Sequence, residues 1–431
     1  MANYKADERI VRQMTDEDKA ALLSIYQHRC LDERLLCKYI YSSVDSSTGY
    51  AAEHINQLIA FRLLDSVDYG LEYPALFLTT LGIETVKATS RSELQKLYSF
   101  EYGKAFLPLS SELKMHPKII NHQMHLNSFV LEFESYAKQI GYFRYFDEKF
   151  MPPASNFMMP DAMAELDDYY VFFEMDMGTE AGSRLAQKWN SYRTFLNAPG
   201  PFYREKPVVM LFIIDGVKNV EVRRRNIASR LMTYLADRVN GQFEVYIDGV
   251  ERLHSVVKSQ LLKQMTPEDF GCDTVCRAIY DMHNFLISKP QFLSQMDISY
   301  GYYIRQLTES KKIQVIGGRP QEFLMDVWLD GRLSVLRSLL YYQRALGQIV
   351  KYSHREIPYI IVVPSEKWAC TMLKMANTAL PEGVFFTTPS RLSSRPWAAA
   401  LFCIDQLWNV AHFTDGSLIK TIHERRMARL S

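Results

Sequence analysis

The segment PDAMAELDDYYVFFEMD, residues 160–176, contains two predicted strands and three candidate site residues. Its first four residues are typical of the start of one strand, and Tyr170–Met175 is typical of a second strand. Side chains repeat every two residues along a strand, so Glu174 and Asp176 share one face of the second strand. A hairpin between the two strands would bring Asp161 close to both. Three carboxylates placed in this way offer hard oxygen ligands, which suit Mg²⁺.

The segments on both sides of this stretch alternate between helices and strands. His125–Ile140 is predicted to be an amphipathic helix, and Ser183–Leu196 a second helix. The apolar run Val208–Ile214 predicts a buried strand, which the helix Glu221–Asn240 follows. Residues 121–250 are therefore predicted to form an α/β domain.

Residues 1–90 have the pattern of a winged helix-turn-helix. Three amphipathic helices are predicted within residues 16–61, and two short strands around a turn follow within residues 63–79. Three helices followed by a hairpin form the winged variant of this DNA-binding motif. The third helix, Gly49–Phe61, would face the DNA bases, and His54 is its candidate DNA contact.

The charge of this N-terminal segment leaves its partner open. Residues 16–90 contain six basic and eleven acidic side chains, a balance of −5, and the third helix has no Lys or Arg. DNA affinity comes mainly from neutralising phosphates, so an acidic helix is poorly suited to contact DNA. The segment is predicted either to contact DNA or to form a protein surface, such as a dimer interface.

The rest of the chain divides into a linker, a connector and a last domain. Residues 91–120 give mixed signals and are predicted as a linker, and residues 251–310 as a mostly helical connector. Helices and strands alternate again in residues 311–431, which predicts a C-terminal α/β domain. Its helix-then-strand order at residues 333–363 resembles that at residues 184–214. A degenerate second copy and the recurrence of a common pairing are both open.

Composition excludes several classes of protein. The chain has 431 residues, of which 48% are hydrophobic, so it is not disordered throughout. There are 50 Lys and Arg against 49 Asp and Glu, which excludes a histone-like coat on DNA and confines any nucleic-acid surface to a local patch. No apolar stretch approaches the roughly 20 residues of a membrane span. Six scattered cysteines and a charged N-terminus predict a reduced, cytoplasmic protein without a signal peptide.

Basic residues concentrate at the start of the helix that follows the buried strand. Three consecutive arginines cannot share one helix face, so part of this run is solvated in any case. The cluster is the predicted contact surface for double-stranded DNA, and an ordinary charged helix face is the alternative. It consists of Lys218, Arg223, Arg224, Arg225 and Arg230.

Pro160-Asp161 followed by Glu174-x-Asp176 resembles the PD-(D/E)xK signature of restriction-endonuclease-like folds. In that signature two acids hold a metal ion and a lysine assists the attacking water. Asp176 stands here where the lysine is expected. Some members carry the lysine on the next helix, where Lys188 could replace it. The resemblance implies an Mg²⁺ site at Asp161, Glu174 and Asp176, with Lys188 as the fourth catalytic residue.

A larger part of the chain, residues 16–215, resembles the replication-relaxation family of plasmid and mobile-element proteins. The family implies a role on DNA in plasmid replication, mobilisation or relaxation in a bacterial cytoplasm. The resemblance rests on several motifs in the same order along the chain. They are Arg62-Leu63-Leu64-Asp65, Leu78-Thr79-Thr80-Leu81-Gly82, His125-x-Asn127, Pro160-Asp161-Ala162 and the segment from Phe173 to Glu180, followed by Lys188, Trp189 and Tyr192.

The sequence thus predicts a multi-domain α/β protein with a winged helix, a restriction-endonuclease-like domain and a C-terminal α/β region. Three functions fit this organisation. The first is a DNA-binding replication, mobilisation or relaxation factor that does not cleave DNA. The second is an Mg²⁺-dependent endonuclease or nickase that uses Asp161, Glu174 and Asp176. The third is a dimeric regulator that pairs through the winged helix and senses a partner or a ligand.

Overall fold

The protein is described by a computed structural model, and its chain forms two compact units. The first unit comprises residues 1–181, 191–218 and 249–254, and the second comprises residues 182–190, 219–248 and 255–431. The molecule is mixed α/β and multi-domain, as predicted, whereas the division of the chain into the five predicted segments stays a prediction. The described residues are 7–41, 48–98, 110–151, 160–178, 182–198, 201–240, 242–259, 261, 272–293, 300–316, 319–376, 380, 382–405 and 407–413.

The first unit begins with a helical module and a small sheet, here called the N-terminal module (α1 to β3, then α5 and α6). Thr15 and Asp18 form a capping box that starts α2, because each side chain accepts a hydrogen bond from the other residue's backbone N–H. In the sheet, β3 pairs antiparallel with both β1 and β2. This order is consistent with the predicted winged helix. The elements are α1 (Glu8–Gln13), α2 (Asp16–His28), β1 (Leu31–Asp32), α3 (Glu33–Tyr39), α4 (Thr48–Ala60), β2 (Leu64–Val67), β3 (Ala75–Leu78), α5 (Thr80–Thr89) and α6 (Arg91–Tyr98).

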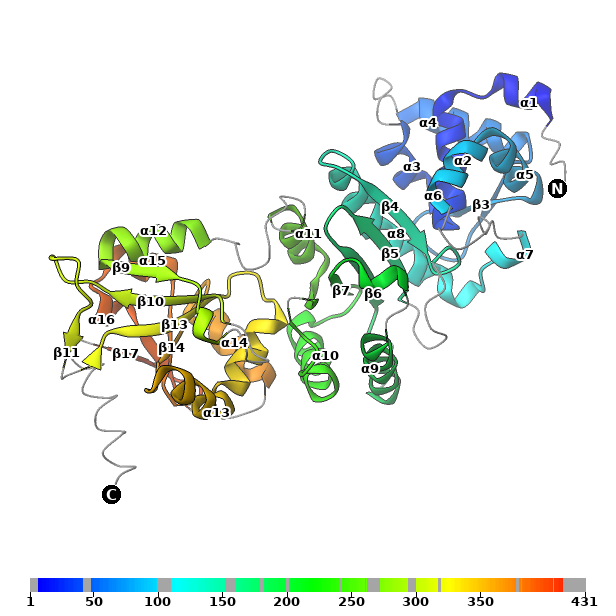
Figure 1. Cartoon of the computed structure of the whole chain (residues 1–431). Coiled ribbons are helices and arrows are strands. Elements are labelled where there is room, and N and C mark those ends of the chain that lie inside the picture. Colours follow the sequence, from blue (N-terminus) through cyan, green and yellow to red (C-terminus); the bar gives the residue numbers. More distant parts are fainter. Residues whose placement is uncertain are drawn as a thin grey trace. The chain divides into compact units, whose positions relative to one another are not determined.

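The larger sheet of the first unit carries helices on both faces (Figure 1). Its strands run in the order β4-β5-β6-β7, with two antiparallel pairs followed by the parallel pair β6–β7. On one face, Phe173 contacts Phe129 and Phe133 of α8, and on the other face Phe172 contacts Phe195 of α9. The elements are α7 (Ser110–Leu113), α8 (Pro117–Ala137), β4 (Phe143–Asp147), β5 (Ala162–Leu166), β6 (Tyr170–Asp176), α9 (Gly182–Asn197) and β7 (Val208–Ile214).

The second unit contains a sheet in the order β17-β16-β15-β14-β13-β10-β9, which is drawn in yellow-green to red in Figure 1. Two of its strands, β9 and β10, lie within the stretch that the sequence predicts as a mostly helical connector, because four- and five-residue strands give little periodic signal. The elements are α10 (Val220–Leu235), β8 (Phe243–Gly249), α11 (Val250–Ser259), α12 (Cys272–His283), β9 (Phe285–Ser288), β10 (Tyr302–Gln306), β11 (Val315–Ile316), β12 (Arg319–Pro320), β13 (Glu322–Val327), α13 (Leu333–Ser353), β14 (Tyr359–Val362), α14 (Glu366–Ala376), β15 (Val384–Thr387), α15 (Pro389–Ser394), α16 (Trp397–Ala400), β16 (Phe402–Ile404) and β17 (Val410–His412).

The same topology occurs twice in the chain. The series α8-β4-β5-β6-α9-β7 has two antiparallel pairs and then a parallel pair. The series α12-β9-β10-β13-α13-β14 has the same pairs, with the short strand pair β11–β12 inserted between β10 and β13. An equivalent backbone hydrogen bond begins both parallel pairs. Tyr170 N donates to Pro207 O at 2.9 Å, and Leu324 N donates to Pro358 O at 2.8 Å. The repeated order favours a second copy over a chance recurrence of helix and strand.

Among the helices of the described residues, none has both the length and the apolar character that crossing a membrane requires.

Candidate functional site

Two of the predicted metal ligands, Glu174 and Asp176, are buried on β6. Glu174 is fully buried, and the hydroxyl of Tyr192 on α9 donates a hydrogen bond to its Oε1. Asp176 is 1% exposed, and its Oδ1 accepts a hydrogen bond from Gly178 N at 2.9 Å. The two side chains lie on the same face of β6, as predicted, and each accepts a hydrogen bond from another group of the protein.

Asp161, the third predicted ligand, is held from the opposite side of the sheet. Its Oδ2 accepts a hydrogen bond from Met175 N at 2.8 Å and lies 3.4 Å from His122 Nε2 on α8. No group of three or more His, Cys, Asp or Glu side chains in the described part of the chain is arranged to hold a metal ion. In this arrangement the three carboxylates do not fit one Mg²⁺ ion, and the predicted site stays a prediction. Lys188 is half-buried on α9, four residues before Tyr192.

The predicted basic cluster divides between exposed and buried side chains. Arg224 is 8% exposed, and its Nη1 is 2.7 Å from Asp248 Oδ2. Arg230 is exposed and donates a hydrogen bond to Gly182 O at 2.6 Å. Arg225 is exposed and Arg223 is half-buried. Lys218, which belongs to the first unit, is also exposed.

His54, the predicted DNA contact of the third helix, contacts other side chains of the N-terminal module. Its Nδ1 is 2.9 Å from Asp18 Oδ1, and its ring lies 4.2 Å from the ring of Tyr50. Tyr41 donates a second hydrogen bond to the same Asp18 oxygen. Because Asp18 also caps α2, His54 supports the fold at this position.

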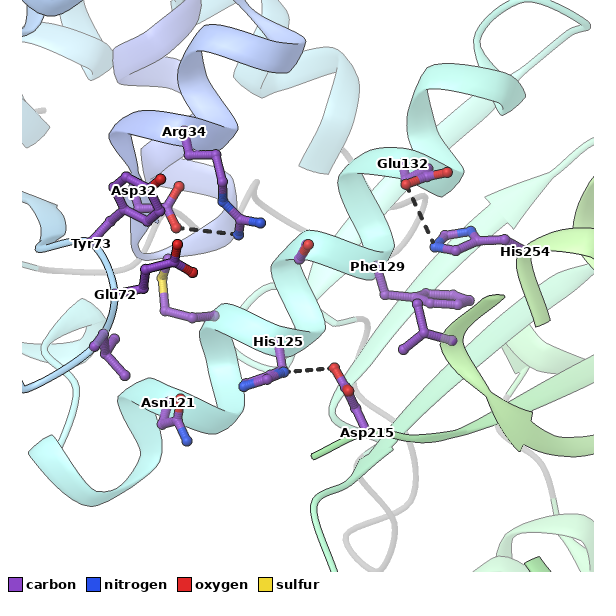
Figure 2. Close-up of a pocket in the computed structure, with 14 residues that line it drawn as sticks. Asp32, Arg34, Glu72, Tyr73, Asn121, His125, Phe129, Glu132, Asp215 and His254 are labelled. Carbon is purple, nitrogen blue, oxygen red and sulfur yellow. Dashed lines mark hydrogen bonds and ion pairs between the residues drawn. The ribbon is translucent and has the colours of Figure 1, made fainter. Parts of the chain in front are cut away.

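A pocket of about 320 Å³ lies within the first unit, between the N-terminal module and α8. Figure 2 shows its lining side chains converging from several elements. Asp32 and Arg34 come from β1 and α3, and Glu72 and Tyr73 come from the loop between β2 and β3. The opposite wall is formed by α8 from Asn121 to Glu132, with Asp215 after β7 and His254 of α11, whose first five residues belong to the first unit.

His125 and Asp215 form the closest polar pair in this pocket (Figure 2). His125 Nδ1 lies 2.6 Å from Asp215 Oδ2, and both side chains are about one-third exposed, at 34% and 33%. The hydrogen bond from His125 holds the pKa of the Asp215 carboxyl below its ordinary value, although burial acts in the opposite direction. Asp215 is therefore ionised at neutral pH.

A second polar pair, Glu132 and His254, closes the other end of the pocket. His254 Nε2 is 4.0 Å from Glu132 Oε2, and the His254 ring stacks on Phe129 at 4.2 Å. Burial raises the pKa of the Glu132 carboxyl, but the hydrogen bond from Tyr136 and the nearby His254 and Lys38 outweigh burial, so the pKa is lowered overall.

The motif His125-x-Asn127 serves two purposes on α8. His125 lines the pocket, whereas Asn127 is fully buried and donates hydrogen bonds to His28 O at 3.0 Å and Cys30 O at 2.6 Å. Asn127 thereby ties the end of α2 to α8. The sequence marks this motif only through its family resemblance, and it gives no signal that Asp215, 90 positions away, is the partner of His125.

Comparison with known proteins finds a family whose model matches most of the first unit. The family described as replication-relaxation matches residues 22–208, a segment that includes the pocket-lining part of α8 and the three predicted metal ligands. No curated protein matches the chain. The predicted resemblance is confirmed: over residues 22–208, from α2 to the start of β7, this chain matches the replication-relaxation family.

Proposed function

We propose that the protein binds double-stranded DNA, without cleaving it, as a replication, mobilisation or relaxation factor of a plasmid or mobile element. The family match supports a role in replication or relaxation. The observation that carries DNA binding is the charge of α10 and of residues 182–190 of α9. Helix α10 has four arginines and one acid, and residues 182–190 contain Arg184 and Lys188 and no acid.

These two basic segments meet within the second unit. Arg230 of α10 donates a hydrogen bond to Gly182 O at the start of α9. Arg184 and Arg225 are exposed, and neither has an ion-pair partner among the described residues. Exposed arginines that the protein does not neutralise can replace the counterions of DNA phosphates, which is the main source of DNA affinity. The surface of Arg184, Arg225 and Arg230 is here called the α9–α10 basic surface.

Charge reversal on this surface tests the proposal. Arg184→Glu/Arg225→Glu is expected to weaken binding to a DNA duplex at least about tenfold and to lower the slope of log affinity against log salt by about 2, because two phosphate contacts are lost. Fluorescence anisotropy between about 50 and about 200 mM salt measures both quantities.

The matched control is Lys311→Glu/Lys312→Glu, which makes the same change in net charge at an exposed turn of the same unit. The control should keep most of the affinity. Equal weakening in both variants would mean that only the overall charge matters and would reject the α9–α10 basic surface as the DNA contact.

We propose that the protein does not cleave DNA because each predicted catalytic carboxylate already accepts a hydrogen bond within the protein. Glu174 binds Tyr192, Asp176 binds Gly178 N and Asp161 binds Met175 N. Supercoiled plasmid incubated with the protein and Mg²⁺ or Mn²⁺ is expected to be retarded in a gel and to stay intact. Nicking that disappears in Asp161→Asn/Glu174→Gln, a variant that keeps hydrogen-bond acceptors at both positions, would establish the Mg²⁺-dependent nuclease instead.

Pairing of two chains through the N-terminal module stays a prediction.

A further inference from the structure

Helix α13 of the second unit contains basic residues and no acidic residue. In the second copy it takes the place that α9 takes in the first copy. Its buried side packs on the sheet, where the ring of Tyr342 lies 5.5 Å from the ring of Tyr359 on β14. Its basic residues are Arg337, which is buried, and Arg344 and Lys351, which are exposed. The exposed side of α13 is therefore positively charged.

The two exposed cations lie on one face of the helix. Arg344, Gly347, Gln348 and Lys351 occupy positions i, i+3, i+4 and i+7 and are all exposed, and they are here called the α13 basic face. The guanidinium carbon of Arg344 lies 5.1 Å from the ring centroid of Tyr341, a cation–π contact that leaves the N–H groups of Arg344 unbonded. Within the described residues, neither Arg344 nor Lys351 has a hydrogen-bond or ion-pair partner. The protein does not neutralise these two charges.

A third cation near this helix has a different environment. Arg355 follows the end of α13, and its Nη2 lies 2.8 Å from Oε2 of the buried Glu322. This guanidinium is neutralised within the fold, so it is not part of the α13 basic face.

Gly347 lies between the two exposed cations, and the fold gives no reason for a glycine there. Glycine in the interior of a helix lowers stability relative to alanine. A Cβ atom at Gly347 would meet no other atom within 4 Å, and the backbone at this position is helical. Glycine is also the residue that allows a ligand to approach the backbone closely. The missing side chain leaves room for a ligand against the helix between Arg344 and Lys351.

The spacing of the two cations suits a row of phosphates. Seven residues separate Arg344 from Lys351, which is about 10 Å along the helix axis. One strand of duplex DNA carries a phosphate about every 3.4 Å along its axis, so this distance spans about three phosphates. The side-chain amide of Gln348, between the cations, can donate a hydrogen bond to a phosphate oxygen. The face therefore matches a phosphate backbone better than a single anion.

We propose that the α13 basic face is a second DNA-contact surface, which binds the phosphate backbone of duplex DNA. Arg344 and Lys351 replace counterions of the phosphates, and the backbone of the DNA strand lies against Gly347. This inference rests on the proposed function, because it takes the ligand to be DNA. It goes beyond that function by giving a role to the second copy, which lies outside the family match.

Charge reversal on the α13 basic face tests the proposal. Arg344→Glu/Lys351→Glu in the full chain is expected to weaken binding to a DNA duplex about fivefold to tenfold and to lower the slope of log affinity against log salt by about 2, because two phosphate contacts are lost. Fluorescence anisotropy at several salt concentrations measures both quantities. Lys311→Glu/Lys312→Glu makes the same change in net charge elsewhere in this unit and should keep most of the affinity.

A variant without a change in charge tests the close approach at Gly347. Gly347→Leu should weaken binding about threefold to fivefold, because the added side chain holds the DNA strand away from the helix. Its melting temperature should not fall, since a Cβ atom has room at this position. The matched control is Ser393→Leu, which adds the same side chain at an exposed position of α15 and should leave binding unchanged.

The outcomes separate this inference from the proposed function. A wild-type chain that binds no duplex rejects both. If charge reversal on the α9–α10 basic surface weakens binding and Arg344→Glu/Lys351→Glu does not, only the α13 basic face is rejected. The reverse pattern supports the α13 basic face and rejects the α9–α10 basic surface. Equal weakening in the lysine control also overturns the inference, and unchanged affinity in Gly347→Leu overturns the close approach of the DNA strand.

Discussion

Asn127 illustrates how a single residue connects two parts of the first unit. It is fully buried, and its side-chain amide donates to the carbonyls of His28 and Cys30 while Gln123 donates to its Oδ1. Backbone carbonyls that lose their only donor in a buried place cost about 1 to 3 kcal/mol each. The docking of α2 against α8 therefore depends strongly on this amide.

Asn127→Ala should lower the free energy of unfolding of the first unit by about 3 kcal/mol, because two buried carbonyls lose their donor. Urea denaturation followed by circular dichroism measures the change. Asn121→Ala is the matched control on the same helix, since Asn121 is exposed, and it should change stability by less than about 0.5 kcal/mol. A similar small effect for both variants would show that Asn127 does not hold α2 in place.

Neighbouring arginines of α10 have different environments. The guanidinium of Arg224 is paired with Asp248 of β8, whereas Arg225 is exposed on the next position of the helix. Because successive residues of a helix point about 100° apart, adjacent arginines of one run cannot contact the same surface. The helix thus uses Arg224 for packing inside the second unit and leaves Arg225 for a partner.

Substituting each of these two arginines by alanine should separate the roles. Arg224→Ala leaves the Asp248 carboxylate without this partner and should lower the free energy of unfolding by about 2 kcal/mol, with little change in DNA affinity. Arg225→Ala should leave stability within about 0.5 kcal/mol and weaken DNA binding. Thermal unfolding and anisotropy on the same samples measure both effects. A loss of DNA affinity in folded Arg224→Ala that matches the loss in Arg225→Ala would contradict this division.

The elements also show what the sequence could predict. The apolar run Val208–Ile214 predicts β7 with its observed bounds, because a buried parallel strand is apolar on both faces. The helix predicted from His125 begins at Pro117, with His116 as its N-cap and Pro117 in its first turn. The sequence does not predict that start, because residues 91–120 give mixed signals that are typical of a linker. The sequence does not predict the pocket, because its walls come from segments that are far apart in the sequence and that only the fold brings together.

The whole chain combines the N-terminal module with two copies of the same α/β strand order, one in each compact unit. The predicted metal ligands lie in the first copy, where Tyr192 of α9 contacts Glu174 and His122 of α8, on the opposite face of the sheet, contacts Asp161. Strand periodicity correctly places Glu174 and Asp176 on one face. It could not place Asp161, whose position depends on how β5 enters the sheet and on contacts with α8.

The repeated order of elements also has an evolutionary consequence. A tandem duplication within one gene is the simplest origin for two copies that share both strand order and strand direction. After such an event each copy accumulates substitutions independently, and the copy under weaker constraint loses its sequence signature while it keeps its backbone. The family match covers residues 22–208, and it therefore includes most of the first copy. Under a tandem duplication, strand pairing would record the common ancestry of the two copies more durably than amino-acid identity does.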